Sequence, residues 1–287
     1  LLAATALLGE LISIPAAAVV IWRTLFAALG AAVCVGLIGR RSLWPGRANA
    51  LSLLGIGMIV GVHWFCFFEA VKVANISICL AGLAASPLFT AFSEALLEKR
   101  RVRRFEVLLG LLVLAGVATI AGAIKRQDLL GFGIALVSAF LAAVFPVLNR
   151  RLVTAGGDPL TMVTWEMAGA YLAALLLLPK FGGMSSLFAW KDLDWLWILI
   201  LSFACTVFAH SFHIRLLQHL SAYTMNLAIS FEPLYGIIAA ALLFGEYKQL
   251  TPMYYVGLSS ILLSNIIHPV CVRLTRSPVA EMDTRPS

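Results

Sequence analysis

Four ionisable side chains lie deep within long apolar stretches of this sequence. They are Arg23, Glu94, Glu166 and Glu232. A charge at the centre of a lipid bilayer costs about 2.5–3.5 kcal/mol even on a lenient scale, so such a residue usually faces a cavity or a partner. These four side chains are therefore candidates for binding a polar substrate or a coupling ion.

Arg23 and Glu166 occupy equivalent positions in two of these stretches. Each follows a tryptophan, as Trp22-Arg23 and Trp165-Glu166, and the two pairs are 143 residues apart. Opposite charges at equivalent positions could pair across a central cavity, or one of them could hold a charged substrate. The alternative is that each charge is satisfied within its own half of the chain.

Histidines form a second set of candidates. His63 lies in one apolar stretch, and His210 and His213 lie in another, three residues apart and so on one face of a helix. Aromatic residues that would complete a wall with them are Trp64, Phe65 and Phe68. Histidine titrates near physiological pH and could carry a coupling proton. The alternative is that these histidines are hydrogen-bonded in helix packing. We predict no metal site, because carboxylate or cysteine companions at ligand spacing are missing.

Glu232 is the strongest single candidate because it directly precedes Pro233. A proline within a helix interrupts it, and the preceding residue is pushed away from helical geometry. Transporters build binding sites at such interruptions near the middle of the membrane. The Glu232 carboxyl could bind a substrate ammonium or carry a coupling proton, and Pro233 and Pro87 are candidate hinges. The alternative is that Glu232 is bonded to a neighbouring helix.

The two prolines belong to an internal repeat. Shifting the sequence by 146 residues places Asn75 on Ser221 and Pro87 on Pro233. Asn75 and Ser221 are both residue types that favour a helix start, and each precedes its proline by twelve residues. Matched interruptions in two halves of a membrane protein indicate a site between the halves.

Composition indicates the elements that carry these residues. The chain is 61% hydrophobic and 12% charged, whereas a soluble domain is about half apolar and a quarter charged. A membrane helix needs about 20 apolar residues. We predict an all-α integral membrane protein with ten helices at 1–14, 16–38, 50–71, 76–97, 105–124, 129–150, 159–179, 193–219, 221–244 and 252–273. The first of these is short, and we expect that an N-terminal piece of it is missing.

Basic residues predict the topology. With the N-terminus inside, thirteen basic residues fall in inside loops and six in outside loops, as the positive-inside rule requires. Five helices per half then invert the second half, with the 98–104 loop inside and the 245–250 loop outside. We predict a first repeat at 1–125, an inverted second repeat at 126–275 and a cytoplasmic tail at 276–287.

Other function classes find little support. The five cysteines lie in apolar stretches without metal-ligand spacing, and no disulfide framework is expected. The basic residues flank helices and form no face of the kind that binds nucleic acid. The sequence has no nucleophile elbow, phosphate loop or HExxH motif. We therefore expect no enzyme, no cofactor and no nucleic-acid partner.

The sequence resembles the EamA-type members of the drug/metabolite transporter superfamily. The residues that carry the resemblance are Arg23, Ala70 to Asn75, Ser86-Pro87-Leu88-Phe89, Leu96-Leu97-Glu98, Gly110, Glu232-Pro233-Leu234-Tyr235, Leu243-Phe244-Gly245-Glu246 and Gly257. The resemblance implies ten helices in two inverted repeats. It also implies a central cavity lined by helices 1–4 and 6–9, with helices 5 and 10 at the periphery. The Trp-Gly start that is typical of the first helix is not visible here.

Residues and resemblance together predict a secondary transporter that works by alternating access. The expected substrate is a small polar metabolite, an amino acid or a related compound, exported across a bacterial-type inner membrane with both termini cytoplasmic. The proton is a candidate coupling ion, and the protein is expected as a monomer or homodimer. The alternatives are a lipid-linked or small-cation carrier of the same fold, and a scaffold or receptor. The sequence leaves substrate identity, direction, coupling ion and oligomeric state open.

Overall fold

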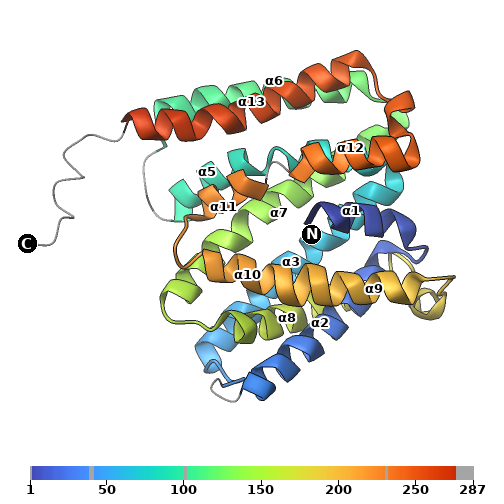
Figure 1. Cartoon of the computed structure of the whole chain (residues 1–287), viewed down its shortest axis with the longest axis vertical. Coiled ribbons are helices and arrows are strands. Elements are labelled where there is room, and N and C mark those ends of the chain that lie inside the picture. The colour runs from blue at the N-terminus through green and yellow to red at the C-terminus, as the bar shows by residue number, and fades with distance from the viewer. Residues whose placement is uncertain (1, 39–41, 98, 100–101, 230–231, 276–287) are drawn as a thin grey trace, which may run out of the picture.

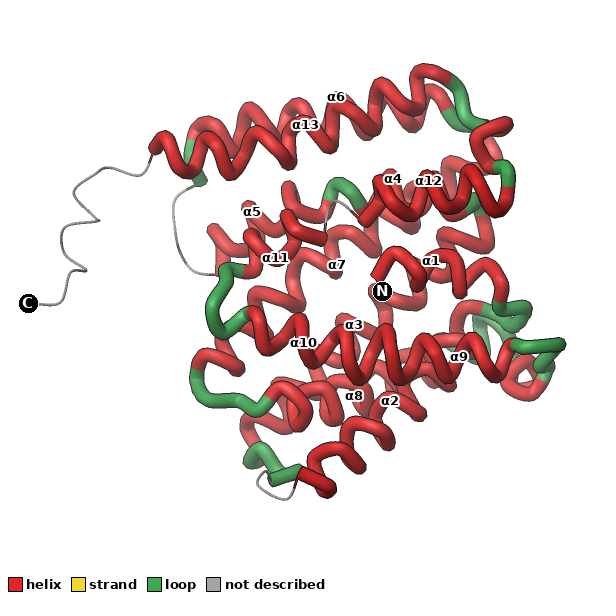
Figure 2. Tube along the Cα trace, viewed as in Figure 1, coloured by secondary structure: helices red, strands yellow, loops and turns green. Residues whose placement is uncertain are grey.

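The computed structural model describes residues 2–38, 42–97, 99, 102–229 and 232–275, and among them every regular element is a helix (Figure 2). In chain order the α-helices are α1 (Leu2–Leu11), α2 (Ala16–Ile38), α3 (Arg47–Val73), α4 (Ile76–Leu83), α5 (Ser86–Leu97), α6 (Arg104–Ala123), α7 (Leu129–Thr154), α8 (Pro159–Leu177), α9 (Asp194–Ser202), α10 (Ala209–Leu216), α11 (Ala222–Ile229), α12 (Glu232–Phe244) and α13 (Pro252–Thr275). Short 3₁₀ turns cover Arg126–Asp128, Met184–Phe188 and Glu246–Gln249. Eight segments of the described chain are long and apolar enough to cross a membrane.

Several predicted helices are continuous, and others are broken. The helix predicted at 105–124, for example, is α6 at Arg104–Ala123. The helix predicted at 76–97 is interrupted in the middle, and the one predicted at 193–219 contains a π-helical segment. The helix predicted at 221–244 is described as α11 and α12, with residues 230 and 231 between them outside the described residues. α1 is ten residues long, shorter than the 1–14 predicted. The interruptions are the features that shape the site.

The first interruption precedes Pro87. α4 ends at Leu83 and α5 begins at Ser86, so Pro87 lies in the first turn of α5, where its missing N–H removes no hydrogen bond. The Ala84 carbonyl left free by the break accepts a 3.0 Å hydrogen bond from Asn265 Nδ2 of α13. A neighbouring helix thus satisfies the exposed backbone, as a break within a membrane requires.

The corresponding segment in the other half of the chain is described on both sides of residues 230 and 231. α11 ends at Ile229 and α12 begins at Glu232, with Pro233 again in the first turn. The broken helices lie against each other, α4 against α12 and α5 against α11 (Figure 1). The predicted interruption at Pro87 is therefore present as a break, whereas the one predicted at Pro233 falls next to residues 230 and 231, which lie outside the described residues.

A third irregularity was not predicted. Between α9 and α10, residues Phe203–Phe208 form a π-helical segment, in which each amide bonds to a carbonyl one residue further back than in an α-helix. Thr206 Oγ1 donates a 2.8 Å hydrogen bond to the Leu201 carbonyl, five residues earlier. Such segments frequently mark functional sites.

α3 and α8 approach very closely through glycine. A Cβ atom added to Gly57 would lie 2.0 Å from the Glu166 carbonyl oxygen, and one added to Gly169 would lie 2.2 Å from that of Leu54. Small residues let membrane helices pack backbone to backbone in this way. The crossing fixes the position of Glu166 within the bundle.

α6 and α13 pack together at one side of the molecule and run antiparallel (Figure 1). Their contact is reciprocal: a Cβ on Gly116 would lie 2.7 Å from the Gly257 carbonyl oxygen, and a Cβ on Gly257 would lie 2.7 Å from that of Gly116. α6 and α13 correspond to the fifth and tenth predicted helices, for which the family resemblance implied a peripheral position.

Candidate functional site

A cavity lies between the two halves of the chain. The space that the centre of a water-sized sphere can occupy in it is about 90 Å³, which is below the range of about 300–1,000 Å³ typical of small-molecule sites. Both proline-containing segments contribute, through Leu83 and Ser86 in the first half and Ile229 and Glu232 in the second. The candidate residues that line this cavity are Arg23, His63, Trp64, His210, His213 and Glu232.

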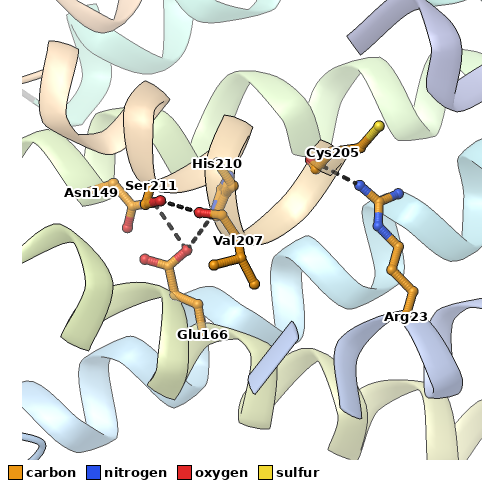
Figure 3. Close-up of polar contacts among 7 residues, drawn as sticks. All are labelled: Arg23, Asn149, Glu166, Cys205, Val207, His210 and Ser211. Atoms are coloured by element: carbon orange, nitrogen blue, oxygen red, sulfur yellow. Dashed lines mark hydrogen bonds and ion pairs between the residues drawn. The ribbon is translucent and has the colours of Figure 1, made fainter. Parts of the chain in front are cut away.

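Arg23 is held in place by the π-helical segment and by an aromatic ring. Its Nε donates a 2.8 Å hydrogen bond to Thr206 Oγ1, and its Nη2 lies 3.5 Å from the Cys205 carbonyl (Figure 3). The guanidinium stacks on Trp64, with Cζ 3.8 Å from the ring centroid. Arg23 is 1% exposed, and its Nη1 has no hydrogen-bond partner among the described residues. This nitrogen remains able to donate to a bound group.

Of the two alternatives left open for Arg23 and Glu166, direct pairing is not what the structure shows. Glu166 Oε2 instead accepts from His210 Nε2 at 2.8 Å and from Asn149 Nδ2 at 3.2 Å. Figure 3 shows the Glu166 carboxyl turned toward His210 and Asn149, while Arg23 points at Cys205. Glu166 is thus satisfied within its own half, whereas Arg23 is held by the other half. Glu166 lies behind the cavity wall, because it is fully buried and does not line the cavity.

Aromatic rings surround the histidines, but only one of the three rings predicted for this role, Trp64, is among them. His210 lies 6.1 Å from Trp64 and 6.0 Å from Phe145, measured between ring centroids. Phe145 of α7 takes the place expected for two other rings. Phe65 packs on Phe181 outside the cavity. Phe68 is fully buried against Phe67, and it too lies outside the cavity lining.

The three histidines differ in their partners. His63 Nδ1 lies 2.9 Å from both the hydroxyl and the carbonyl oxygen of Ser138 on α7, so this ring is engaged in helix packing. His210 is engaged with Glu166. His213 is 8% exposed, and its Nε2 is a buried ring nitrogen without a hydrogen-bond partner among the described residues.

Glu232 lies in the first turn of α12. It lines the same cavity as Arg23. Its repeat counterpart, Ser86, also lines the cavity. The cavity therefore holds one fixed cation from the first half and one carboxyl from the second.

Glu94 lies outside the cavity lining. Its Oε1 accepts a 2.9 Å hydrogen bond from the Tyr223 amide in the first turn of α11. Glu246, which the sequence did not single out as a site residue, does the same at the start of α4. It accepts from the amides of Ile76 and Ser77 at 3.1 and 2.9 Å, and from the Ser77 hydroxyl at 2.5 Å. Carboxylates are favourable at helix N-termini, so each broken helix is capped by the opposite half.

The comparisons with known proteins agree with this architecture. The model of the EamA-like transporter family matches residues 1–122 and 129–267, which is nearly the whole chain in two repeats. The chain belongs to the EamA-like transporter family. A solved structure described as "Crystal structure of protein" superposes with a TM-score of 0.66 at 17% identity. The match covers 96% of this chain and 93% of that one, and at this identity it shows the fold alone. A search of curated proteins found no match.

The family match and the apolar helices together show that the protein is a multi-pass membrane protein. Sequence reasoning missed the cavity residues that other elements supply, namely Cys205, Phe145 and Ala142. It also missed the polar partners Thr206, Ser138 and Asn149. Asn149 carried a signal that could have found it, because it is an amide within an apolar stretch. Within the described residues, no three His, Cys, Asp or Glu are grouped to hold a metal ion.

Proposed function

We propose that this protein is a secondary transporter for small zwitterionic metabolites such as amino acids, working by alternating access and exporting its substrate. The observation that carries the proposal is the single cavity in which Arg23 and Glu232 lie together. In this arrangement the substrate carboxylate binds the unpartnered Nη1 of Arg23, and the substrate ammonium binds Glu232. Burial away from water strengthens both interactions.

The geometry also supports selection by size and shape. Trp64 and Phe145 give the cavity apolar walls, which suit the carbon skeleton of a small metabolite. Trp64 also holds the Arg23 guanidinium by cation–π stacking, so the carboxylate site is pre-organised before substrate arrives. A pre-organised site binds its ligand without first ordering a long, flexible side chain.

Alternating access follows from the proposed architecture. We infer ten membrane segments in two inverted repeats, residues 1–125 and 126–275, in a bacterial-type inner membrane with both termini cytoplasmic. The breaks before Pro87 and Pro233 act as hinges, so each half of a broken helix moves with the opposite repeat. The cross-repeat caps at Glu246 and Glu94 support this coupling, since each ties the start of one broken helix to the other half.

The test is flux into proteoliposomes across a panel of amino acids and related metabolites. We expect saturable uptake of at least one zwitterion by the wild-type protein. Glu232→Gln should remain folded and lose most of that flux. Exposed Glu10 provides the matched control, because Glu10→Gln removes a carboxylate outside the cavity. Wild-type flux in Glu232→Gln, or no flux of any zwitterion in the wild type, would contradict the proposal.

A further inference from the structure

An acid–imidazole pair lies directly behind the cavity wall. His210 Nε2 and Glu166 Oε2 are 2.8 Å apart, and the two side chains are 6% and 0% exposed. Asn149 Nδ2 donates a second hydrogen bond to the same carboxyl oxygen. The other oxygen, Oε1, has no hydrogen-bond partner among the described residues. Figure 3 shows the Glu166 carboxyl turned toward His210, which lies on α10.

One proton makes this pair electrically neutral overall. With the proton on the imidazole the pair is an ion pair, and with the proton on the carboxyl both groups are uncharged. Removing that proton leaves a single buried carboxylate whose direct partners, Asn149 and neutral His210, are uncharged. An uncompensated charge in such surroundings is strongly unfavourable. A further positive charge nearby would compensate that carboxylate and so favours loss of the proton.

Access to this proton runs through the imidazole. His210 lines the cavity, whereas Glu166 does not. The other titratable or charged side chains that line the cavity are Arg23, His63, Cys205, His213 and Glu232. Arg23 keeps its charge, and Ser138 engages Nδ1 of His63. A cation entering the cavity meets the protonated pair across the ring of His210.

We propose that Glu166 and His210 form the proton-binding site that couples transport to a proton gradient. The proposal rests on the transport function proposed above. A substrate ammonium in the cavity and a proton on the pair repel each other, so binding of one favours release of the other. The N–H or O–H bond of the pair breaks, and the proton leaves through the cavity on the side opposite to substrate release. The result is exchange of one proton for one substrate.

The experiment separates coupling from transport in proteoliposomes. Equilibrium exchange of a labelled amino acid from the panel, with equal pH on both sides, needs no net proton movement. Accumulation driven by a pH gradient does need it, and a gradient of one unit supports up to about tenfold accumulation at one proton per substrate. Proton movement is followed with a pH-sensitive dye trapped in the vesicles. The variants are Glu166→Gln and His210→Gln, with His219→Gln as the control, because His219 is exposed and outside the cavity.

We expect Glu166→Gln and His210→Gln to lose gradient-driven accumulation and substrate-dependent proton movement by a much larger factor than they lose exchange, while His219→Gln behaves as wild type. If Glu166→Gln does not fold, His210→Gln alone decides the outcome. Gradient-driven accumulation that survives in His210→Gln overturns the coupling site. So does a wild-type protein that exchanges substrate without any proton movement. If the wild-type protein exchanges no compound of the panel, the transport proposal is wrong, and the coupling proposal that rests on it is wrong as well.

Discussion

The glycine crossing of α3 and α8 gives the most quantitative prediction. In Gly57→Ala the new Cβ would lie 2.0 Å from the Glu166 carbonyl oxygen, 2.7 Å from its carbonyl carbon and 2.8 Å from its Cα. All three are backbone atoms, so no side chain can rotate away and the helices must move apart. Overpacking of this kind costs about 1–3 kcal/mol. Because the contact is with Glu166 itself, the movement also disturbs the hydrogen bond to His210.

Gly55 in the same helix supplies the control. A Cβ there meets no atom within 4 Å, and alanine is favoured over glycine in a helix by about 1 kcal/mol. We expect Gly57→Ala to lower the melting temperature of the detergent-purified protein and reduce zwitterion flux, while Gly55→Ala matches or exceeds wild type. Thermal unfolding followed by size-exclusion chromatography measures the first effect. A Gly57→Ala variant as stable as Gly55→Ala would refute the close crossing.

Three further predictions concern the charges and the topology. Arg23→Lys keeps the positive charge but loses the flat surface that stacks on Trp64, an interaction worth about 2 kcal/mol when buried. The substrate KM should therefore rise roughly 30-fold. An unchanged KM in flux assays contradicts the stacked site. Glu246→Ala leaves two helix amides unsatisfied at about 1 kcal/mol or more each, so its melting temperature should fall while that of Glu10→Ala does not. Single cysteines at 102 and 248 in a cysteine-free background should label from opposite sides of the membrane, and labelling from one side removes the inverted repeat.

Much of the architecture could be predicted from composition and periodicity. Apolar stretches bounded by charges give helix positions because a membrane leaves few other choices for the backbone. The break before Pro87 could be predicted because proline lacks the amide that a continuous helix needs. The π-helical segment at Phe203–Phe208 was not visible, since its residues are ordinary helix formers. Only the placement of Arg23 against Thr206 gives this segment a role.

The sequence analysis selected several of the residues that line the cavity, but it did not identify their hydrogen-bond partners. Buried charge is costly, so Arg23 and Glu232 could be selected from sequence depth alone, and both line the cavity. Partner choice depends on helix rotation and depth to within a few ångströms, which sequence spacing does not fix. This is why the sequence left open whether Glu166 pairs with Arg23 and did not identify His210 as its partner. Glu94 was selected on the same ground of depth, yet it caps a helix.

The central claim is that Arg23 binds the carboxylate and Glu232 binds the ammonium of one zwitterionic substrate. Comparing the transport of substrates that differ in charge tests this claim most directly. Uptake of an amino acid is compared with uptake of its analogues lacking either the carboxyl or the amino group, in wild type, Arg23→Gln and Glu232→Gln. The account predicts that the wild-type protein prefers the zwitterion, that Arg23→Gln loses its preference over the amine, and that Glu232→Gln loses its preference over the acid. Equal loss of all three compounds in both variants, with the wild-type order of preference retained, would contradict it.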